Sequence, residues 1–440
     1  MLLVGVDVGG TFTDGVVYDG NTRRLHYAKA ASTPHDPTQA VLNVLESLVP
    51  NINDIDRLVH GLTIGTNAIL EGKGADVWIL TTRGFRDVLE IARTNRPILY
   101  NIKSLKPEAL VPRTRTLEIN ERMLFDGSVR EFFDDKDARE VIAKLVGAKA
   151  DAVAICFLHS YANPAHEKLA EELVREMLPD AFVCSSASVL SQFREYERFN
   201  TTALNAYIGP LMSDYLDSLR DRLGAAGYKQ SIFLMASNGG VSNLDLVKQL
   251  PVTTVLSGPA GGVAAAIELG ERVNIRNLIT CDMGGTSTDV CLIQDLEVPV
   301  THEQFIGSYA NRTPQIEINA VGAGGGSIAW LDAGDILMVG PQSAGADPGP
   351  ACYGIGGAEP TLTDAQLLLG RLTEKGLLGG RLPLDKSLAE KTFEKIADQM
   401  ELEIFDVAAG AIRIANQRMI EAIKLVTIDR GSDPRDFSLF

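Results

Sequence analysis

An eight-residue phrase occurs twice in the chain, and its residue types suit phosphate and magnesium chemistry. DVGGTFTD begins at Asp7 and DMGGTSTD begins at Asp282; the copies agree at six of eight positions and lie 275 residues apart. Paired glycines let the backbone turn sharply, and their amides and the threonine hydroxyls offer donors to phosphate oxygens. A leading aspartate at a strand end can hold a hydrated Mg²⁺ ion. One such turn is often only structural, but two copies predict hairpins that clamp a polyphosphate.

The elements around each copy repeat as well. LLVGVDV, TFTDGVVYD and RRLHYAKA predict three strands at the N-terminus, and residues 277–305 repeat that order as NLITCDMGG, TSTDVCLIQ and LEVPVTHEQF. A repeated supersecondary unit indicates two homologous lobes that face each other. Between the copies, helical and apolar stretches alternate, which is typical of α/β layers.

Composition excludes several classes of protein. A chain of 440 residues with 45% hydrophobic residues predicts two or three compact units, and a net charge of −16 opposes binding to nucleic acid or an anionic membrane. No apolar run is long enough to span a bilayer, and Asp7 interrupts any signal-peptide core, so we expect a cytoplasmic protein. Five scattered cysteines indicate reduced thiols, and the histidine spacing predicts no dedicated zinc site.

Seven stretches give the chain a specific resemblance to the hydantoinase A/5-oxoprolinase family, of the actin-like ATPase and sugar kinase superfamily. They are DVGGTFTD at Asp7, HGLTIGTNAILEGKGA at His60, TTRGFRDVLEIARTNRP at Thr81, SGPAGG at Ser257, DMGGTSTDV at Asp282, GAGGGS at Gly322 and SAGADPGPACYG at Ser343. Their order and joint presence extend the resemblance over essentially the whole chain.

The resemblance implies an α/β fold of two actin-like (ribonuclease H-like) lobes with mixed sheets and a nucleotide cleft between the lobes. Residues 1–200 would form the N-terminal hydantoinase/oxoprolinase lobe with the first hairpin, and residues 201–440 the hydantoinase A core with the second. The cofactors would be ATP and Mg²⁺. The implied partner is a second subunit of the hydantoinase B type. Association of the chain with further copies of itself is a second possibility.

The implied reaction is ATP-dependent opening of a cyclic amide such as a hydantoin or 5-oxoproline. Such an amide is resonance-stabilised, and phosphorylation of its oxygen creates a leaving group and an activated carbon that water can attack. Related family members carboxylate ketones with the same activation. A small-molecule kinase and a fragment that binds no nucleotide are further alternatives.

By similarity, Asp7 and Asp282 would be the carboxylates on the magnesium side, and Asp14 and Asp289 would either position water or brace their turns. The expected phosphate-binding residues of the hairpins are Gly9, Gly10, Thr11, Thr13, Gly284, Gly285, Thr286 and Thr288.

Further candidates have equally plausible structural explanations. His60, Thr66 and Asn67 match a block beside the family's phosphate site, yet the last two also make an ordinary helix start. SGPAGG, with Ser257, Gly258 and Gly261, could receive an anion at a helix N-terminus or form a tight loop. GAGGGS, with Gly324 and Gly325, permits close approach to a nucleotide or is simply flexible.

Asp347 and Cys352 could line the site, although for Cys352 a buried structural cysteine is the favoured explanation. Arg83, Arg93 and Arg96 could bind a substrate carboxylate or form surface ion pairs. In the family, the segment matching RGSDPRDFSLF continues into a third glycine-rich turn that helps to hold adenosine. We therefore expect an incomplete adenosine side, through truncation or a natural split into subunits.

Overall fold

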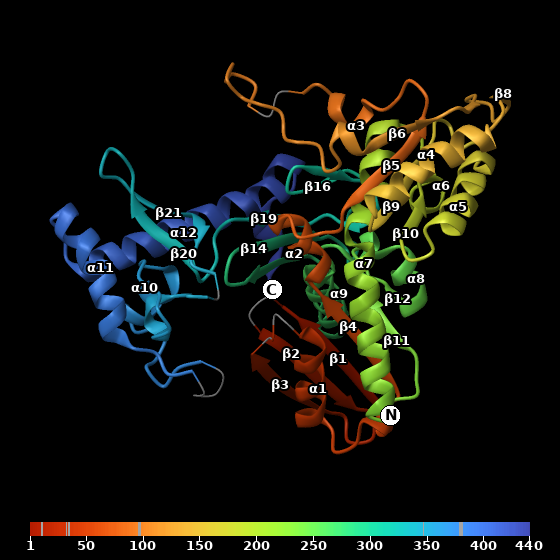
Figure 1. Ribbon diagram of the computed structural model, residues 1–440. Coiled ribbons are helices and arrows are strands. Elements are labelled where there is room, and N and C mark those ends of the chain that lie inside the picture. The colour runs from red at the N-terminus through yellow and green to blue at the C-terminus, as the bar shows by residue number, and fades with distance from the viewer. Residues whose placement is uncertain (10–11, 32, 34–35, 96–97, 346, 378–381) are drawn as a thin grey trace. The chain divides into compact units, whose positions relative to one another are not determined.

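The computed structural model describes residues 1–440 except 10–11, 32, 34–35, 96–97, 346 and 378–381 (Figure 1). The described chain divides into two compact units, one formed by residues 1–258 and 300–315 and the other by residues 259–299 and 316–440. The expected domain boundary after residue 200 lies inside a helix of the first unit. The assignment of homologous lobes to residues 1–200 and 201–440 stays a prediction.

A six-stranded mixed sheet carries the first hairpin of unit 1. Its order is β12-β11-β4-β1-β2-β3, with β11, β4 and β1 parallel to one another and β12, β2 and β3 antiparallel to their neighbours. The strands are β1 (Leu2–Val8), β2 (Phe12–Asp19), β3 (Arg24–Ala31), β4 (Arg57–Leu62), β11 (Ile232–Met235) and β12 (Val241–Asn243). Helix α1 (Pro37–Leu48) packs on β2 and β3, and α2 (Ile64–Glu71) follows β4 directly.

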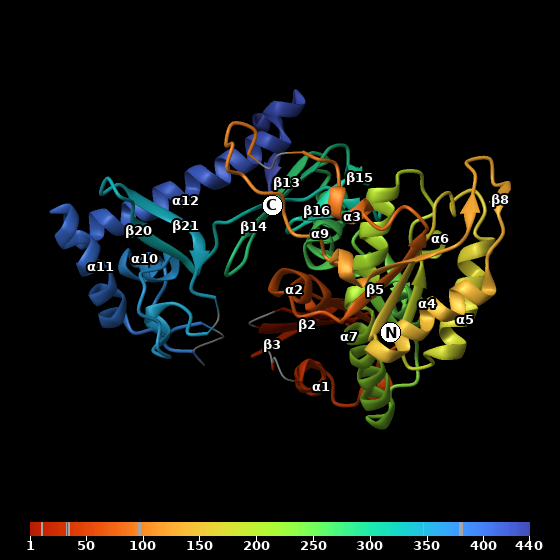
Figure 2. The same cartoon turned by 45° about the horizontal axis from the view of Figure 1, so that its top comes forward.

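A second sheet of unit 1 is entirely parallel, in the order β10-β9-β5-β6. Helices α4 (Asp135–Ala148) and α5 (Ala165–Met177) cover one face, where Leu80 and Ile155 are buried (Figure 2). The helix α7 (Glu195–Ala225) covers the other face, on which Ile79 and Ala154 lie. The strands are β5 (Val77–Thr82), β6 (Thr116–Ile119), β9 (Ala152–Cys156) and β10 (Phe182–Ser185).

Short elements complete unit 1. They are α3 (Val88–Ile91), β7 (Arg122–Met123), β8 (Val129–Glu131), α6 (Ser186–Val189), α8 (Leu244–Gln249), β15 (Val300–Thr301), β16 (Gln304–Ile306) and β17 (Tyr309–Asn311). The β16–β17 ribbon packs on α7. Residues 296–305 were expected to be the third strand of the downstream repeat, but within them residues 300–301 form β15 and residues 304–305 belong to β16.

The central sheet of unit 2 repeats the topology around the first hairpin. Its order is β19-β14-β13-β22, with two antiparallel pairs followed by a parallel one, as in β3-β2-β1-β4. The strands are β13 (Leu278–Met283), β14 (Thr288–Ile293), β19 (Asn319–Val321) and β22 (Ser438–Leu439). The true third strand is therefore β19, which follows the detour of residues 300–315. Helix α9 (Ser257–Val273) buries one face of this sheet and α12 (Ile404–Val426) the other.

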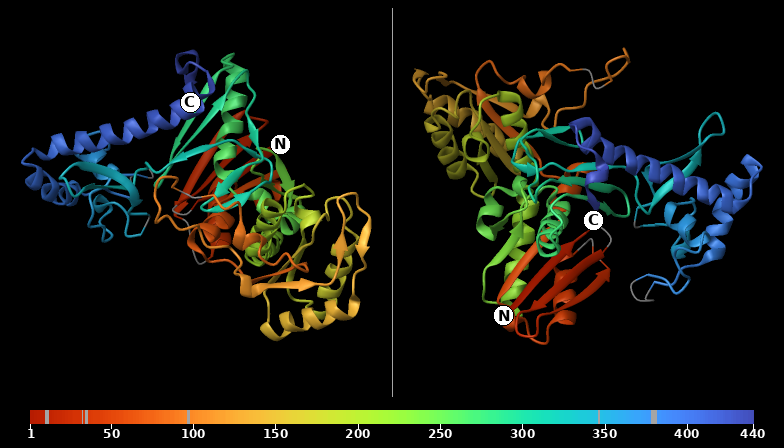
Figure 3. Two further views of the ribbon diagram at one scale, coloured as in Figure 1. Left: turned by 90° about the horizontal axis from the view of Figure 1, so that it is seen from above. Right: turned by 180° about the vertical axis from the view of Figure 1, so that it is seen from behind.

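A helical layer with a β hairpin forms the rest of unit 2 (Figure 3). The β20–β21 hairpin packs with α10, α11 and α12 around buried residues that include Val339 and Phe393. These elements are β20 (Ser327–Leu331), β21 (Leu337–Ser343), α10 (Leu362–Leu368) and α11 (Lys386–Met400), and the two-residue strand β18 (Gln315–Ile316) pairs with β15. The chain is thus a mixed α/β protein. Among the described residues, no helix is both long and apolar enough to cross a membrane.

Candidate functional site

The first hairpin holds the carboxylate of Asp7 beside its turn. Asp7 pairs with Asp14 across β1 and β2, and Gly61 of β4 lies beside Asp7 on the other side. A Cβ atom on Gly61 would lie 2.5 Å from Asp7 Oδ1, so a glycine leaves room for this carboxylate. Sequence reasoning did not single out Gly61; a glycine inside an apolar strand was the available signal.

The remaining residues of this hairpin are only partly described. Thr13 is fully buried and Gly9 is half-buried. Gly10 and Thr11, which we expected to bind phosphate, lie outside the described residues. The phosphate-binding role of this turn stays a prediction.

Asp14 takes part in a cross-strand ion pair. Lys29 lies directly opposite Asp14 on β3, and its Nζ atom is 2.8 Å from both carboxylate oxygens. Both side chains are well exposed, so the pair contributes at most roughly 1 kcal/mol to stability. This geometry favours the bracing role over the water-positioning role for Asp14.

The start of α2 is fastened to the end of β1. Thr63 donates to the carbonyl oxygen of Val8 from both its backbone nitrogen, at 3.3 Å, and its Oγ1, at 3.1 Å. Asn67 in turn donates from Nδ2 to Thr63 Oγ1 at 3.4 Å. Asn67 therefore supports Thr63, which in turn bonds the end of β1, and it does not contact the turn through this bond.

Two other predicted residues fix the loop that leads into α9. Thr66 Oγ1 accepts a bond of 3.0 Å from the backbone nitrogen of Leu256, which has a positive φ of 64°. Ser257 is fully buried and donates from Oγ to the carbonyl oxygen of Leu62 at 3.4 Å. Gly258 and Gly261 are half-buried in the first turns of α9. Thr66 and Ser257 thus have structural partners, and their hydroxyl groups position the start of the helix.

His60 lies in the core of unit 1 and not at a surface. It is fully buried, with Nδ1 3.1 Å from the carbonyl oxygen of Val6 and Nε2 2.6 Å from Tyr215 Oη. Burial lowers the pKa of His60 to about 4, so the ring is neutral at pH 7. Both ring nitrogens are engaged on the core face of β4, which favours a structural role for His60; the expectation that it acts in catalysis stays a prediction.

The second hairpin has the same register as the first. Asp282 lies opposite Asp289, and Met283 lies opposite Thr288, as Asp7 lies opposite Asp14 and Val8 opposite Thr13. Its tight turn closes through a bond of 2.9 Å from the nitrogen of Gly284 to the carbonyl oxygen of Ser287. Gly284, Gly285 and Thr286 are exposed, whereas Thr288 is fully buried and donates to the carbonyl oxygen of Ala323.

The GAGGGS loop packs its backbone against this second turn. Gly325 and Gly326 donate from their nitrogens to the carbonyl oxygens of Gly284 and Gly285, at 3.0 and 2.6 Å. A Cβ atom on Gly324 would lie only 2.6 Å from the hairpin backbone, so that position requires glycine. The loop is therefore a fixed support of the hairpin.

A pocket of about 230 Å³ within unit 2 contains both aspartates of the second hairpin. Pro259 and Gly262, in the first turns of α9, line it together with Asp282 and Asp289. Burial, and then the charge of Asp282, raises the pKa of Asp289 to about 6. Two carboxylates beside the start of a helix form an environment that a cation would stabilise. The described residues contain no group of three or more His, Cys, Asp or Glu side chains placed to hold a metal ion.

The other candidates are dispersed. Asp347 is exposed, and Cys352 is fully buried, where burial and then Asp364 raise the pKa of its thiol. Arg83 pairs with Asp137 at 3.4 Å on the surface. Cys352 is therefore a structural residue, as the alternative explanation held.

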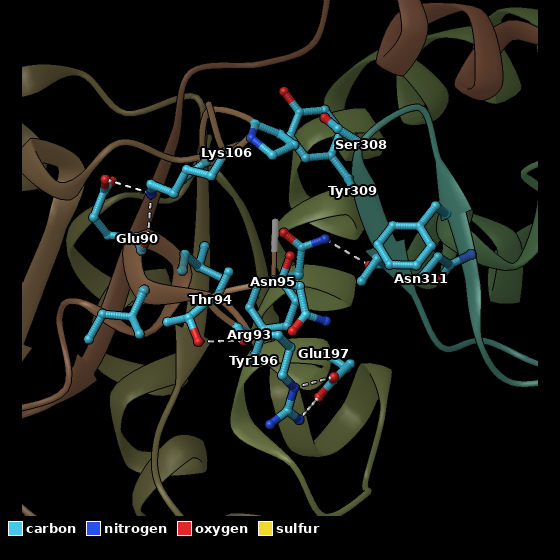
Figure 4. Close-up of a pocket in the computed structure, with 18 of the residues that line it drawn as sticks. Glu90, Arg93, Thr94, Asn95, Lys106, Tyr196, Glu197, Ser308, Tyr309 and Asn311 are labelled. Atoms are coloured by element: carbon cyan, nitrogen blue, oxygen red, sulfur yellow. Dashed lines mark hydrogen bonds and ion pairs between the residues drawn. The ribbon is translucent and has the colours of Figure 1, made fainter. Parts of the chain in front are cut away.

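Arg93 is held by a carboxylate of its own unit. Its Nε and Nη2 atoms lie 2.7 and 2.5 Å from the two oxygens of Glu197 (Figure 4). Arg96 lies outside the described residues.

Comparisons with known proteins agree with this geometry. A family model described as hydantoinase/oxoprolinase matches residues 198–440, and one described as the hydantoinase/oxoprolinase N-terminal region matches residues 3–178. The caprolactamase subunit alpha of Pseudomonas jessenii is 38% identical over 99% of this chain and 64% of its own length. The acetophenone carboxylase gamma subunit of Aromatoleum aromaticum is 36% identical over 99% of this chain and 62% of its own length.

Solved structures show the same likeness. A nucleotide-free acetone carboxylase superposes with a TM-score of 0.87 at 27% identity, over 100% of this chain and 64% of that one. The ATP-dependent caprolactamase of Pseudomonas jessenii superposes with a TM-score of 0.84 at 37% identity, over 99% of this chain and 65% of that one. The chain spans less than two thirds of the length of these relatives. Since the family model alone covers more than half of the sequence, the chain belongs to the hydantoinase/oxoprolinase family.

Proposed function

We propose that the chain is the ATP-binding part of an enzyme that opens a cyclic amide by phosphoryl activation. The observation that carries this proposal is the pair of hairpins with one sequence pattern and one register. Asp7 faces Asp14 in the first, and Asp282 faces Asp289 in the second. Two such turns, one on each lobe of an actin-like arrangement, would bind the phosphates of ATP in a cleft between the lobes.

The residues at the second hairpin fit a magnesium ion. Asp282 and Asp289 lie directly opposite each other, and cross-strand neighbours of like charge repel at this spacing. Burial, and then the charge of Asp282, raises the pKa of Asp289. Mg²⁺ prefers carboxylate oxygens and water, so Asp282 and Asp289 would hold it here, and Asp7 would serve the first hairpin. Bound Mg²⁺ would supply charge neutralisation for the phosphates.

The backbone of the two hairpins would bind the phosphates and orient them for transfer. Backbone amides of Gly9 and Gly285 would orient the polyphosphate, whereas the amide of Gly284 closes the second turn, and the loop with Gly324 and Gly325 would keep that turn in place. Transfer of the terminal phosphoryl group to the amide oxygen would give an activated carbon for attack by water, with ADP, phosphate and the opened amino acid as products. The role of each residue here is part of the proposal.

A second subunit is part of the proposal as well. The relatives named above are called subunits, and this chain covers less than two thirds of their length. We propose that a hydantoinase B type partner, in the cytoplasm, completes the enzyme. A homo-oligomer is compatible with this arrangement, and the net charge of −16 disfavours nucleic acid and membrane surfaces as partners.

Phosphate release from ATP and Mg²⁺ tests the proposal. The panel would contain ε-caprolactam, 5-oxoproline, a hydantoin, and acetophenone with bicarbonate, each with and without a hydantoinase B type subunit. Asp7→Asn and Asp282→Asn should abolish substrate-dependent release, whereas Asp54→Asn and Asp398→Asn, at exposed positions of the same two units, should not. Full activity of either hairpin variant, or no ATP binding by calorimetry, would refute it.

A carboxylase subunit is the second candidate function. The superposition on acetone carboxylase, an enzyme of ATP-dependent acetone carboxylation, favours it. In that case, phosphate release in the same panel would require the ketone and bicarbonate together. A stable phosphorylated product without free phosphate would indicate a kinase.

A further inference from the structure

Gly325 connects the second hairpin to the helical layer of unit 2. Its nitrogen donates to the carbonyl oxygen of Gly284 at 3.0 Å, and its own carbonyl oxygen accepts two bonds of 2.8 Å from Thr363. One of the two comes from the backbone nitrogen of Thr363 and the other from its Oγ1. Thr363 lies in the first turn of α10, which packs against β20 (Figure 1). Thr363 is thus two hydrogen bonds away from the turn that contains Gly284.

The start of α10 is itself held firmly. Thr361 and Asp364 form a capping box, in which the side chain of each accepts a bond from the backbone nitrogen of the other. The buried carboxylate of Asp364 also accepts from the nitrogen of Cys352 at 2.8 Å. A backbone N–H in the first turn of a helix has no partner within the helix, and the carbonyl oxygen of Gly325 supplies one for Thr363. The bonds from Thr363 therefore start from a fixed point.

The first hairpin is held by a threonine in the same manner. The backbone nitrogen and Oγ1 of Thr63 both donate to the carbonyl oxygen of Val8, at the end of β1. One threonine thus gives two donors to one carbonyl oxygen at each hairpin, directly at the first and through Gly325 at the second. Since the two hairpins share one register, the recurrence of this contact indicates a requirement that both turns have.

The loop between Thr363 and the second hairpin depends on bonds to its backbone. Residues 323–326 carry no polar side chain, so main-chain contacts decide how they are held. A parallel link runs from the nitrogen of Ala344 to the carbonyl oxygen of Gly326, at 2.8 Å. That donor is a backbone group, which a side-chain substitution leaves intact. The hydroxyl of Thr363 is a part of this support that a substitution can remove without altering the loop.

We propose that Thr363 positions the second hairpin for the phosphates of the nucleotide, acting through Gly325. The inference rests on the proposed function and adds to it a positioning residue that lies outside both hairpins. Without the hydroxyl, the loop keeps the backbone bond from Thr363 but becomes more mobile, and a nucleotide that binds the turn must then immobilise it. The expected loss is therefore a loss of nucleotide affinity.

Two substitutions at this position test the role of the hydroxyl. Thr363→Val removes the donor and preserves the shape of the side chain, whereas Thr363→Ser retains the donor. Calorimetry with ATP and Mg²⁺ on the intact chain would measure the dissociation constant. We expect Thr363→Val to weaken ATP binding about two- to tenfold, the worth of one hydrogen bond, and Thr363→Ser to bind ATP as the unmodified chain does.

Thr392→Val is the matched control in the same helical layer. Thr392 is 7% exposed and Thr363 is 8% exposed, and Thr392 Oγ1 donates to the carbonyl oxygen of Ala389 at 2.9 Å within α11. Both valine variants delete one bond from a threonine to a carbonyl oxygen, but only the bond from Thr363 leads to the hairpin. Thr392→Val should lower the urea midpoint about as much as Thr363→Val and leave ATP affinity unchanged. Equal ATP affinities of the two valine variants would show a merely structural role and overturn the proposal.

Hydrogen exchange separates this proposal from the proposed function. In the chain without nucleotide, Thr363→Val should speed exchange of the amides of Gly325 and Gly326 about two- to tenfold relative to Thr392→Val. That result in a chain that binds no ATP would leave Thr363 as the support of the turn and refute the enzyme. Substrate-dependent phosphate release with unchanged exchange at these amides would keep the enzyme and refute the role of Thr363.

Discussion

Gly324→Ala should loosen the second hairpin, and the structure gives the size of the effect. The new Cβ would lie 2.6 Å from the hairpin backbone, against an ordinary contact that begins at 3.4 Å, so loop and hairpin must separate by roughly 0.8 Å. The bond from Gly325, now 3.0 Å, would lengthen to roughly 3.8 Å and break, and the bond from Gly326, now 2.6 Å, would lengthen to roughly 3.4 Å and weaken. Losing one bond and weakening the other costs about 1–2 kcal/mol of unfolding free energy.

Urea unfolding followed by circular dichroism would measure this loss, and hydrogen exchange would report whether the amides of Gly325 and Gly326 lose protection. Gly285→Ala is the matched control, because its Cβ would meet nothing within 4 Å. That control should keep full stability and yet lower ATP affinity if the turn contacts phosphate. A Gly324→Ala variant within about 0.5 kcal/mol of the unmodified chain, with both amides still protected, would refute the reasoning.

Two further predictions concern pH. Asp289 has a raised pKa of about 6, so between pH 4 and 6 the folded chain retains a proton that the unfolded chain releases. The free energy of unfolding should therefore fall as the pH rises from about 4 to 6. Asp289→Asn should remove this fall, which urea unfolding at pH 4.5 and 6.5 would measure. His60 has a pKa lowered to about 4 and acts in the opposite direction. Its contribution to the free energy of unfolding is present above pH 6.5 and is lost as the pH falls toward 4. His60→Leu should abolish that component and cost about 1–3 kcal/mol at pH 7, because the hydroxyl of Tyr215 and the carbonyl of Val6 lose a buried partner. The difference in unfolding free energy between each variant and the unmodified chain, plotted against pH, separates the contributions of Asp289 and His60. A difference that does not change with pH would contradict the pKa shift assigned to that residue.

Local sequence patterns predicted most elements correctly because the signals are short-range. Alternation of apolar stretches with helical ones indicated the α/β fold, and the two hairpins lie where the repeated phrase predicted them. The third strand of the downstream repeat was misplaced. Residues 296–305 are as strand-like as β19, but β16 pairs with β17, which packs on α7, and β19 takes the third place in the central sheet.

The surroundings of the candidate site residues could not be predicted from the sequence, since burial and partners are tertiary properties. Histidine, threonine and serine in glycine-rich segments suggest chemistry, yet His60, Thr66 and Ser257 have structural partners far along the chain. Conversely, sequence reasoning did not single out Gly61, because its closeness to the Asp7 carboxylate becomes apparent only when β4 pairs with β1.

The sequence by itself determined the family, through its seven matching stretches, and the two hairpins with their aspartates, because eight consecutive residues are enough to specify a turn and the residues on either side of it. Tertiary structure decided which side chains around those hairpins are available. The neutral state of His60, the raised pKa of Asp289 and the pairing of Arg93 with Glu197 all depend on groups from distant segments. Desolvation and charge pairing act through space, and the spacing of residues along a chain does not contain them.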